Sequence, residues 1–238
     1  MVTWRAQAVK RKEALGARVR RQCAEEWGRP QRGGVLSSDA RFTVTRTLSK
    51  DQQARRERLI DSARELALQG GYPAVTMHDV ADRAGVARAT VYRYFATKDH
   101  LLTEVAAAWA HYVTDDIDAL AVGDTQLERL TALLERIVYV AAREPTLTSA
   151  IIQAVTSDDS SVDDARTVLF QFLRDRLSAA IGDPVPERED VELVLGHILL
   201  AALISLASLR QPVEEVATMV RTSGRLVLAG ALAAASPT

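Results

Sequence analysis

One short segment, "RATVYRYF" at 88–95, carries side chains that could bind nucleic acid. In a helix, Arg88, Ala89, Tyr92 and Arg93 lie three and four positions apart and therefore share one face. Arginine forms bidentate hydrogen bonds with guanine edges or phosphates, a tyrosine hydroxyl bonds to phosphate oxygens, and alanine lets a helix approach base edges closely. Double-stranded DNA would use all of these groups together.

The other face of this segment is apolar, which indicates that the helix packs on a core. Val91 and Phe95 lie four positions apart on that face. A longer helix precedes them, because from about Lys50 the apolar residues recur at helical spacing until Gly70 and Gly71 supply a C-terminal stop. We expect the apolar faces of these two helices to bury each other.

A short helix and a tight turn lead into the "RATVYRYF" segment. Thr76, followed three residues later by Asp79, is a capping-box pattern that opens this short helix, and Gly85 ends it. Its inward-facing residues are Val80, Ala81 and Ala84. Because only a few residues separate it from the helix at 88–94, the two segments predict a helix-turn-helix.

The net charge of the chain, -1 at pH 7, conceals a division between its two ends. Residues 1–100 carry 20 Lys and Arg against 11 Asp and Glu, a net charge of +9, whereas residues 101–238 carry 10 against 20, a net charge of -10. A basic part favours a polyanion as partner, and an acidic part discourages indiscriminate binding to the same polyanion. The two ends of the chain should therefore meet different partners.

Composition excludes several classes of protein. The single cysteine, Cys23, cannot form an internal disulfide, and no apolar signal region follows the charged N-terminus, so we expect a cytoplasmic protein. The longest apolar run, 193–209, is short for a membrane span and contains His197, which predicts a buried or interface helix and no membrane partner. The sequence has no paired carboxylates, catalytic triad pattern, phosphate-binding loop or metal-ligand spacing, so we expect neither an enzyme nor a metal or cofactor.

Residues 50–102, above all "TMHDVADRAGVARATVYRYFATKDHLL", closely resemble the N-terminal domain of TetR-type transcriptional regulators. The likeness lies in the helix before the turn, the Gly-Val turn, the Thr-Val-Tyr-x-Tyr-Phe segment and the lysine that opens the next helix. The resemblance implies that Arg88, Ala89 and Arg93 face the major groove. The residues that it implies for phosphate contacts are Thr76, Thr90, Tyr92, Tyr94 and Lys98.

Composition, helical periodicity and the resemblance together predict an all-α fold in three parts, of which the N-terminal extension departs from the family pattern. These are a basic, flexible N-terminal extension at 1–49, the helix-turn-helix DNA-binding domain at 50–97, and a helical effector-binding and dimerisation domain at 98–238. The extension either adds phosphate contacts or results from a start codon placed too far upstream, and both interpretations stay open. From "REPTLTSAIIQAV" onward the chain resembles the repressors of cholesterol and steroid catabolism.

Six amphipathic or apolar helices are expected in the C-terminal part, separated by Gly, Pro, Asp and Ser. The expected ranges are 98–120, 124–143, 145–155, 161–181, 188–210 and 212–232. The last two helices are apolar beyond the needs of one small domain and rich in Ala, Ser and Gly, so a second copy of the chain would cover them. The family resemblance likewise implies a homodimer, formed through a four-helix bundle.

A cavity among these helices would be lined mainly by carbon, which favours a small, neutral, hydrophobic effector of steroid or acyl type. The candidate ligand-binding residues are Trp109, Tyr112, Tyr139, Gln153, Phe170 and His197. The alternative interpretation is that the aromatic residues only pack the core and that His197 is a hydrogen-bonded interior or interface residue.

These observations favour a ligand-responsive DNA-binding transcriptional regulator, a repressor that the effector releases from a palindromic operator. Two alternatives remain at this point. One is a helical adaptor whose basic surface binds an acidic protein partner, and the other is a constitutive DNA binder without an effector.

Overall fold

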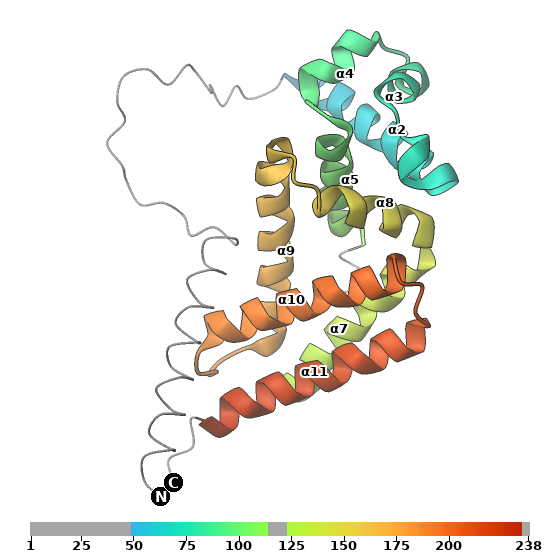
Figure 1. The fold of residues 1–238 in the computed structure, drawn as a ribbon. Coiled ribbons are helices and arrows are strands. Elements are labelled where there is room, and N and C mark those ends of the chain that lie inside the picture. Colours follow the sequence, from blue (N-terminus) through green and yellow to red (C-terminus); the bar gives the residue numbers. More distant parts are fainter. Residues whose placement is uncertain (1–48, 114–122, 235–238) are drawn as a thin grey trace, which may run out of the picture. The chain divides into compact units, whose positions relative to one another are not determined.

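A computed structural model describes residues 49–113 and 123–234 of the chain. Every regular element in these residues is a helix, which confirms the all-α prediction (Figure 1). The predicted extension at 1–49 lies outside the described residues except for Ser49. The last part of the helix expected at 98–120, from residue 114 on, also lies outside them.

The first described helix, α2 (Lys50–Ala74), begins and ends close to where the sequence indicates. Ser49 caps it: its hydroxyl accepts from the Gln52 amide, and the Gln52 side chain accepts from the Ser49 amide. This reciprocal pairing satisfies two backbone donors that the first turn leaves free. Helical geometry breaks at Gly71, where φ is 67°, a left-handed conformation that glycine adopts without a steric penalty.

The helix-turn-helix is formed as predicted by α3 (Met77–Ala84) and α4 (Arg88–Tyr94). The Thr76 hydroxyl accepts from the Asp79 amide at 3.1 Å and so caps α3. Gly85 ends α3 in the left-handed region, with φ 66° and ψ 39°. The turn is short because this one glycine reverses the chain direction without needing a longer loop.

The body consists of α5 (Lys98–Tyr112) and the helices described from residue 123 on. They are α7 (Gln126–Arg143), α8 (Pro145–Val155), the 3₁₀ turn η1 (Ser160–Val162), α9 (Asp163–Ile181), α10 (Arg188–Ala207) and α11 (Val213–Ala234). Five of the six predicted ranges agree with these bounds to within a few residues, and the exception is 98–120, because α5 already ends at Tyr112. The helix predicted to reach Arg210 ends earlier, at Ala207, because Arg210 takes a left-handed φ of 53°.

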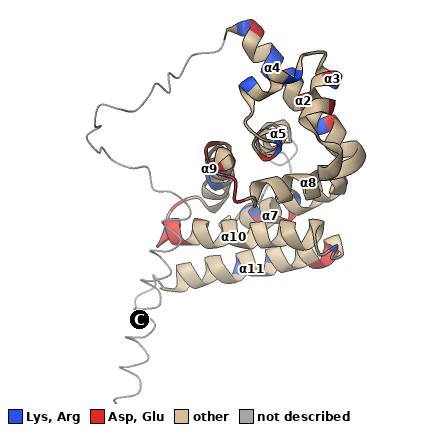
Figure 2. Cartoon of the chain, turned by 45° about the horizontal axis from the view of Figure 1, so that its top comes forward, with Lys and Arg blue, Asp and Glu red and all other residues tan. Residues whose placement is uncertain are grey.

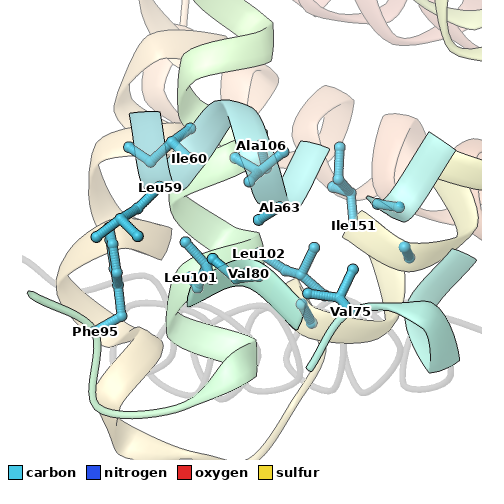
Figure 3. Packing of buried hydrophobic residues seen from close by; sticks show 14 of the residues in the cluster. Leu59, Ile60, Ala63, Val75, Val80, Phe95, Leu101, Leu102, Ala106 and Ile151 are labelled. Atoms are coloured by element: carbon cyan, nitrogen blue, oxygen red, sulfur yellow. The ribbon is translucent and has the colours of Figure 1, made fainter. Parts of the chain in front are cut away.

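Buried apolar side chains form two clusters. The first joins α2, α3, α4 and α5 to α8 and to one turn of α9, and it contains Leu59, Val80, Phe95, Leu101 and Ile151 (Figure 3). The second joins α7, α9, α10 and α11. The helix-turn-helix therefore shares one core with α5 and α8, which fixes its position relative to them.

Helix α10 has the length and apolar composition of a membrane-spanning helix, although a core or interface helix passes the same test. Only part of this apolar surface is buried within the chain, since Val194 and the flanking Leu209 are exposed. On α11, Gly224 permits close packing against α7, where an added Cβ would lie 2.7 Å from Cδ1 of Leu134.

Candidate nucleic-acid interface

Helix α4 has one buried face and one exposed face, as its sequence predicts. Val91 and the following Phe95 are fully buried in the first core cluster. Arg88, Ala89 and Arg93 are exposed, and Tyr92 is 46% exposed. The structure therefore brings the four residues of the predicted DNA face together at the surface, on a helix that is anchored from behind.

The two arginines of this face contact aromatic rings. The Nη2 of Arg88 donates to the hydroxyl of Tyr92 at 3.1 Å, and its guanidinium carbon lies 5.4 Å from the centre of that ring. The guanidinium of Arg93 lies 5.9 Å from the ring centre of Tyr94. Within the described residues neither arginine forms an ion pair, and α4 itself has no acidic residue. Their positive charge remains available to an external anion (Figure 2).

The residues predicted to bind phosphate differ in their exposure and in the hydrogen bonds that they already form within the chain. Thr76 is exposed, but its hydroxyl caps α3 and donates to the Asp79 carboxylate at 2.5 Å, so an acidic group stands beside it. Thr90 is half-buried on α4, and Tyr94 is half-buried against the first core cluster. The phosphate contacts of all three remain predictions.

Lys98 lies at the start of α5, and its ammonium group already has contacts within the chain. Its ammonium donates to the backbone carbonyl of Tyr72 at 2.8 Å and lies 3.5 Å from the centre of that ring. Partial burial lowers the pKa of Lys98, and the charge of the neighbouring Asp99 opposes this effect. An ammonium group has three N–H donors, so a phosphate contact can coexist with the bond to Tyr72 and remains a prediction.

The sequence reasoning did not consider three arginines of α2. Arg56 places its guanidinium 5.6 Å from the ring centre of Phe95, so this part of α2 lies beside the C-terminal end of α4, but Arg56 is already paired with Glu104 at 2.6 Å. Its neighbours Arg55 and Arg58 are half-buried and exposed, respectively, and form no ion pair within the described residues. The three-residue spacing of these arginines was the available signal, because it places both on one side of α2.

Of the candidate ligand-binding residues, Trp109 and Tyr112 lie near one another at the end of α5. The Trp109 indole donates to the Glu144 carboxylate at 2.8 Å, and Arg64 bonds to the same carboxylate at 2.7 Å. The Arg64 guanidinium also lies 5.8 Å from the ring centre of Tyr112, which is 80% exposed. Arg64 thus links the two aromatic residues to α2.

The other four candidates lie on four different helices. Tyr139 of α7 donates its hydroxyl to Glu214 of α11 at 2.7 Å, a bond that raises the pKa of the phenol. Gln153 of α8 is exposed, and Phe170 of α9 packs against the first core cluster. His197 of α10 shares a hydrogen bond of 2.8 Å with the Leu193 carbonyl. Within the described residues the contacts of Tyr139, Phe170 and His197 are with different neighbours, and the ligand role of all four candidates remains a prediction.

Comparison with known proteins covers both parts of the described fold. Residues 59–105 match the family model of bacterial regulatory proteins, tetR family, and residues 123–227 match that of a tetracyclin repressor-like C-terminal domain. The HTH-type transcriptional repressor KstR of Rhodococcus jostii is 34% identical over 183 residues, which are 76% of this chain and 85% of that protein.

Two further comparisons agree with this result. KstR of Mycobacterium tuberculosis is 30% identical over 183 residues, covering 76% of this chain and 83% of that protein. The crystal structure of a TetR transcriptional regulator from Rhodococcus sp. RHA1 is 28% identical, with a TM-score of 0.65 over 76% of this chain and 98% of that one. Since the likeness extends from the helix-turn-helix through the body, the chain belongs to the TetR family of ligand-responsive, DNA-binding transcriptional regulators.

Proposed function

We propose that this protein is a cytoplasmic repressor without enzymatic activity, which binds an inverted-repeat operator as a homodimer and leaves it when a small hydrophobic molecule binds. The observation that carries the proposal is the exposed face of α4. It presents Arg88 and Arg93 without carboxylate partners in the described residues, and buried Val91 and Phe95 hold it in place. An anchored helix whose guanidinium groups have no acidic partner in the described residues is suited to enter the major groove.

The proposed dimer interface consists of α10 and α11. Large apolar side chains remain exposed on these helices or beside them, among them Val194, Leu209, Met219, Leu226 and Leu232. Leu226 is 58% exposed in the single chain, and covering such side chains stabilises an association by the hydrophobic effect. A two-fold axis through these helices would give the dimer two copies of α4, one for each half-site.

The effector is proposed to bind within the body, among α5, α7, α8 and α9. Apolar residues dominate the inner faces of these helices, including Val105, Leu134, Ile151 and Leu169. A neutral, largely hydrophobic ligand of steroid or acyl type suits such surroundings, because burying an unpaired charge among them would be unfavourable. Effector binding would lower the affinity for DNA, and DNA binding would lower the affinity for the effector by the same factor, as thermodynamic linkage requires.

The operator is tested by selecting bound genomic fragments and footprinting them. Two recognition helices related by two-fold symmetry should protect an inverted repeat whose half-site centres lie about 34–36 Å, or a multiple of this, apart. Arg88→Ala and Arg93→Ala should weaken binding, whereas Arg210→Ala, a matched loss of one exposed arginine after α10, should not. Binding to no DNA, or equal losses for all three variants, would contradict the proposal.

The effector is tested separately by thermal-shift screening with steroid, fatty-acyl and aromatic compounds, followed by competition with operator DNA. Compounds that raise the melting temperature should lower operator affinity. If the stabilising compounds leave operator affinity unchanged, the proposed release mechanism is wrong, although the DNA-binding function would stand.

A further inference from the structure

The contact between Arg88 and Tyr92 joins two side chains of the DNA-facing surface to each other. The Nη2 of Arg88 lies 3.1 Å from the Tyr92 hydroxyl, and the guanidinium carbon lies 5.4 Å from the ring centre. The hydrogen bond and the cation–π contact both hold the guanidinium over the same ring. Arg88 therefore has a defined place on the free protein's surface although it is exposed.

The geometry of the helix explains why these two residues meet. Long and aromatic side chains in a helix point back toward its N-terminus, so Tyr92 reaches toward the residue four positions earlier, which is Arg88. Arg88 is the first residue of α4, the end from which recognition helices of this kind contact base edges. No acidic residue of α4 competes for the guanidinium.

The neighbouring pair, Arg93 and Tyr94, lacks this arrangement. These residues are adjacent in sequence, and the Arg93 guanidinium lies 5.9 Å from the Tyr94 ring centre. No hydrogen bond joins them within the described part of the chain. Tyr94 also packs against the first core cluster, whereas Tyr92 stays at the surface. Of the two tyrosines, only Tyr92 holds an arginine by its hydroxyl.

We propose that Tyr92 is a positioning residue for Arg88 and that it thereby sets sequence specificity at the base pair that Arg88 reads. This inference rests on the proposed DNA-binding function. The phenol oxygen accepts one guanidinium N–H and fixes the plane of the group, which leaves further N–H donors for a base edge. A free arginine would have to lose its side-chain freedom on binding, and an arginine held beforehand loses less.

The test is a double-mutant cycle on the full-length protein with Tyr92→Phe, Arg88→Ala and the double variant. Each is measured for affinity to the operator and to operators altered at single base pairs, at one fixed salt concentration. Tyr92→Phe should reduce discrimination at the base pair read by Arg88 by about 3- to 10-fold, the range expected for a hydrogen bond of a charged group at a partly exposed site. In the Arg88→Ala background the same change should have no further effect.

Two controls separate positioning from other roles. Tyr94→Phe removes the hydroxyl of the neighbouring tyrosine and should leave discrimination at the Arg88 base pair unchanged. Thermal unfolding of Tyr92→Phe should match the wild type, since the hydroxyl lies at the surface and the ring is kept.

Other outcomes are distinguishable. If Tyr92→Phe weakens binding to all sequences equally, and by the same factor in both backgrounds, Tyr92 contacts phosphate independently and the inference is overturned. Unchanged base preference in Tyr92→Phe also overturns it, while the DNA-binding function stands. If the wild-type protein binds no DNA sequence, the proposed function itself fails, and the inference fails with it.

Discussion

Glu144 connects three helices, and its replacement by glutamine should measurably destabilise the protein. One carboxylate oxygen accepts from Nη2 of Arg64 on α2 at 2.7 Å, and the other accepts from Nε1 of Trp109 on α5 at 2.8 Å. Glu144 itself lies at the junction between α7 and α8. Because the three partners come from distant parts of the sequence, these two bonds form only in the folded state.

The magnitude follows from burial and geometry. Hydrogen bonds to charged groups contribute about 1.5–3 kcal/mol when buried, whereas exposed ion pairs contribute about 0.2–1 kcal/mol. The Arg64 and Glu144 side chains are 30% and 28% exposed, which places them between these limits. Glutamine has nearly the same shape and can still accept from Trp109, so we expect Glu144→Gln to lower the free energy of unfolding by about 1–2 kcal/mol. For a protein of this size, the melting temperature should fall by about 3–6 °C.

The assay is urea and thermal unfolding at one fixed protein concentration, since dimerisation makes stability depend on concentration. Glu135→Gln is the matched control, because Glu135 pairs with Arg221 at 3.0 Å and that arginine is 52% exposed. The control should change the free energy of unfolding by less than about 0.5 kcal/mol. Equal effects of the two substitutions would refute the view that Glu144 ties α2 to the body.

Three further predictions concern the core and its charges. Gly224→Val should lower the free energy of unfolding by about 1–3 kcal/mol in a urea titration, because an added Cβ would lie 2.7 Å from a buried leucine of α7. Phe95→Ala should cost about 3–5 kcal/mol in the same assay and abolish operator binding, since the fully buried ring supports α4. Burial would raise the pKa of Glu104, but the bonds from His100 and Arg56 outweigh it and lower the pKa below 4.5. The charged form of Glu104 therefore stabilises the folded protein above pH 4.5, and this stabilisation is lost as the pH falls through the lower pKa of the folded state. In unfolding titrations at several acidic pH values, Glu104→Gln should make the free energy of unfolding depend less on pH than in the wild type.

The helix-turn-helix could be predicted from the sequence because its signals are local. A threonine with an aspartate three residues later, a glycine at the turn and a four-residue apolar spacing each act within one or two helical turns. Thr76 and Gly85 accordingly cap α3 as expected, and Val91 and Phe95 are buried as expected. The surface position of Arg88 and Arg93 follows from the same spacing.

Contacts between distant segments could not be predicted in this way. An apolar spacing shows that α5 and α8 have a buried face, but it does not show that this face completes the core beneath the DNA-binding helices. In the same way, the motif places Lys98 at the start of a helix, yet its bond to the Tyr72 carbonyl depends on the break in α2 at Gly71. Periodicity predicts which face of a helix is buried, but it does not predict which other helix packs against that face.

The distribution of charge explains how a protein with a net charge of -1 can bind a polyanion. In the body, arginines form ion pairs with carboxylates of the chain. Arg174 of α9, for example, pairs with the buried Glu192 of α10 at 3.0 Å. On α4, by contrast, Arg88 and Arg93 have no carboxylate partner within the described residues, so their field is not cancelled locally. Within the described residues, we therefore expect attraction to DNA at this surface, and the net charge of -10 on residues 101–238 disfavours contact between the body and the duplex. Because two arginines can neutralise only a few phosphates, we expect the α4 surface to add little to affinity for DNA in general and to supply selectivity through its bonds to base edges.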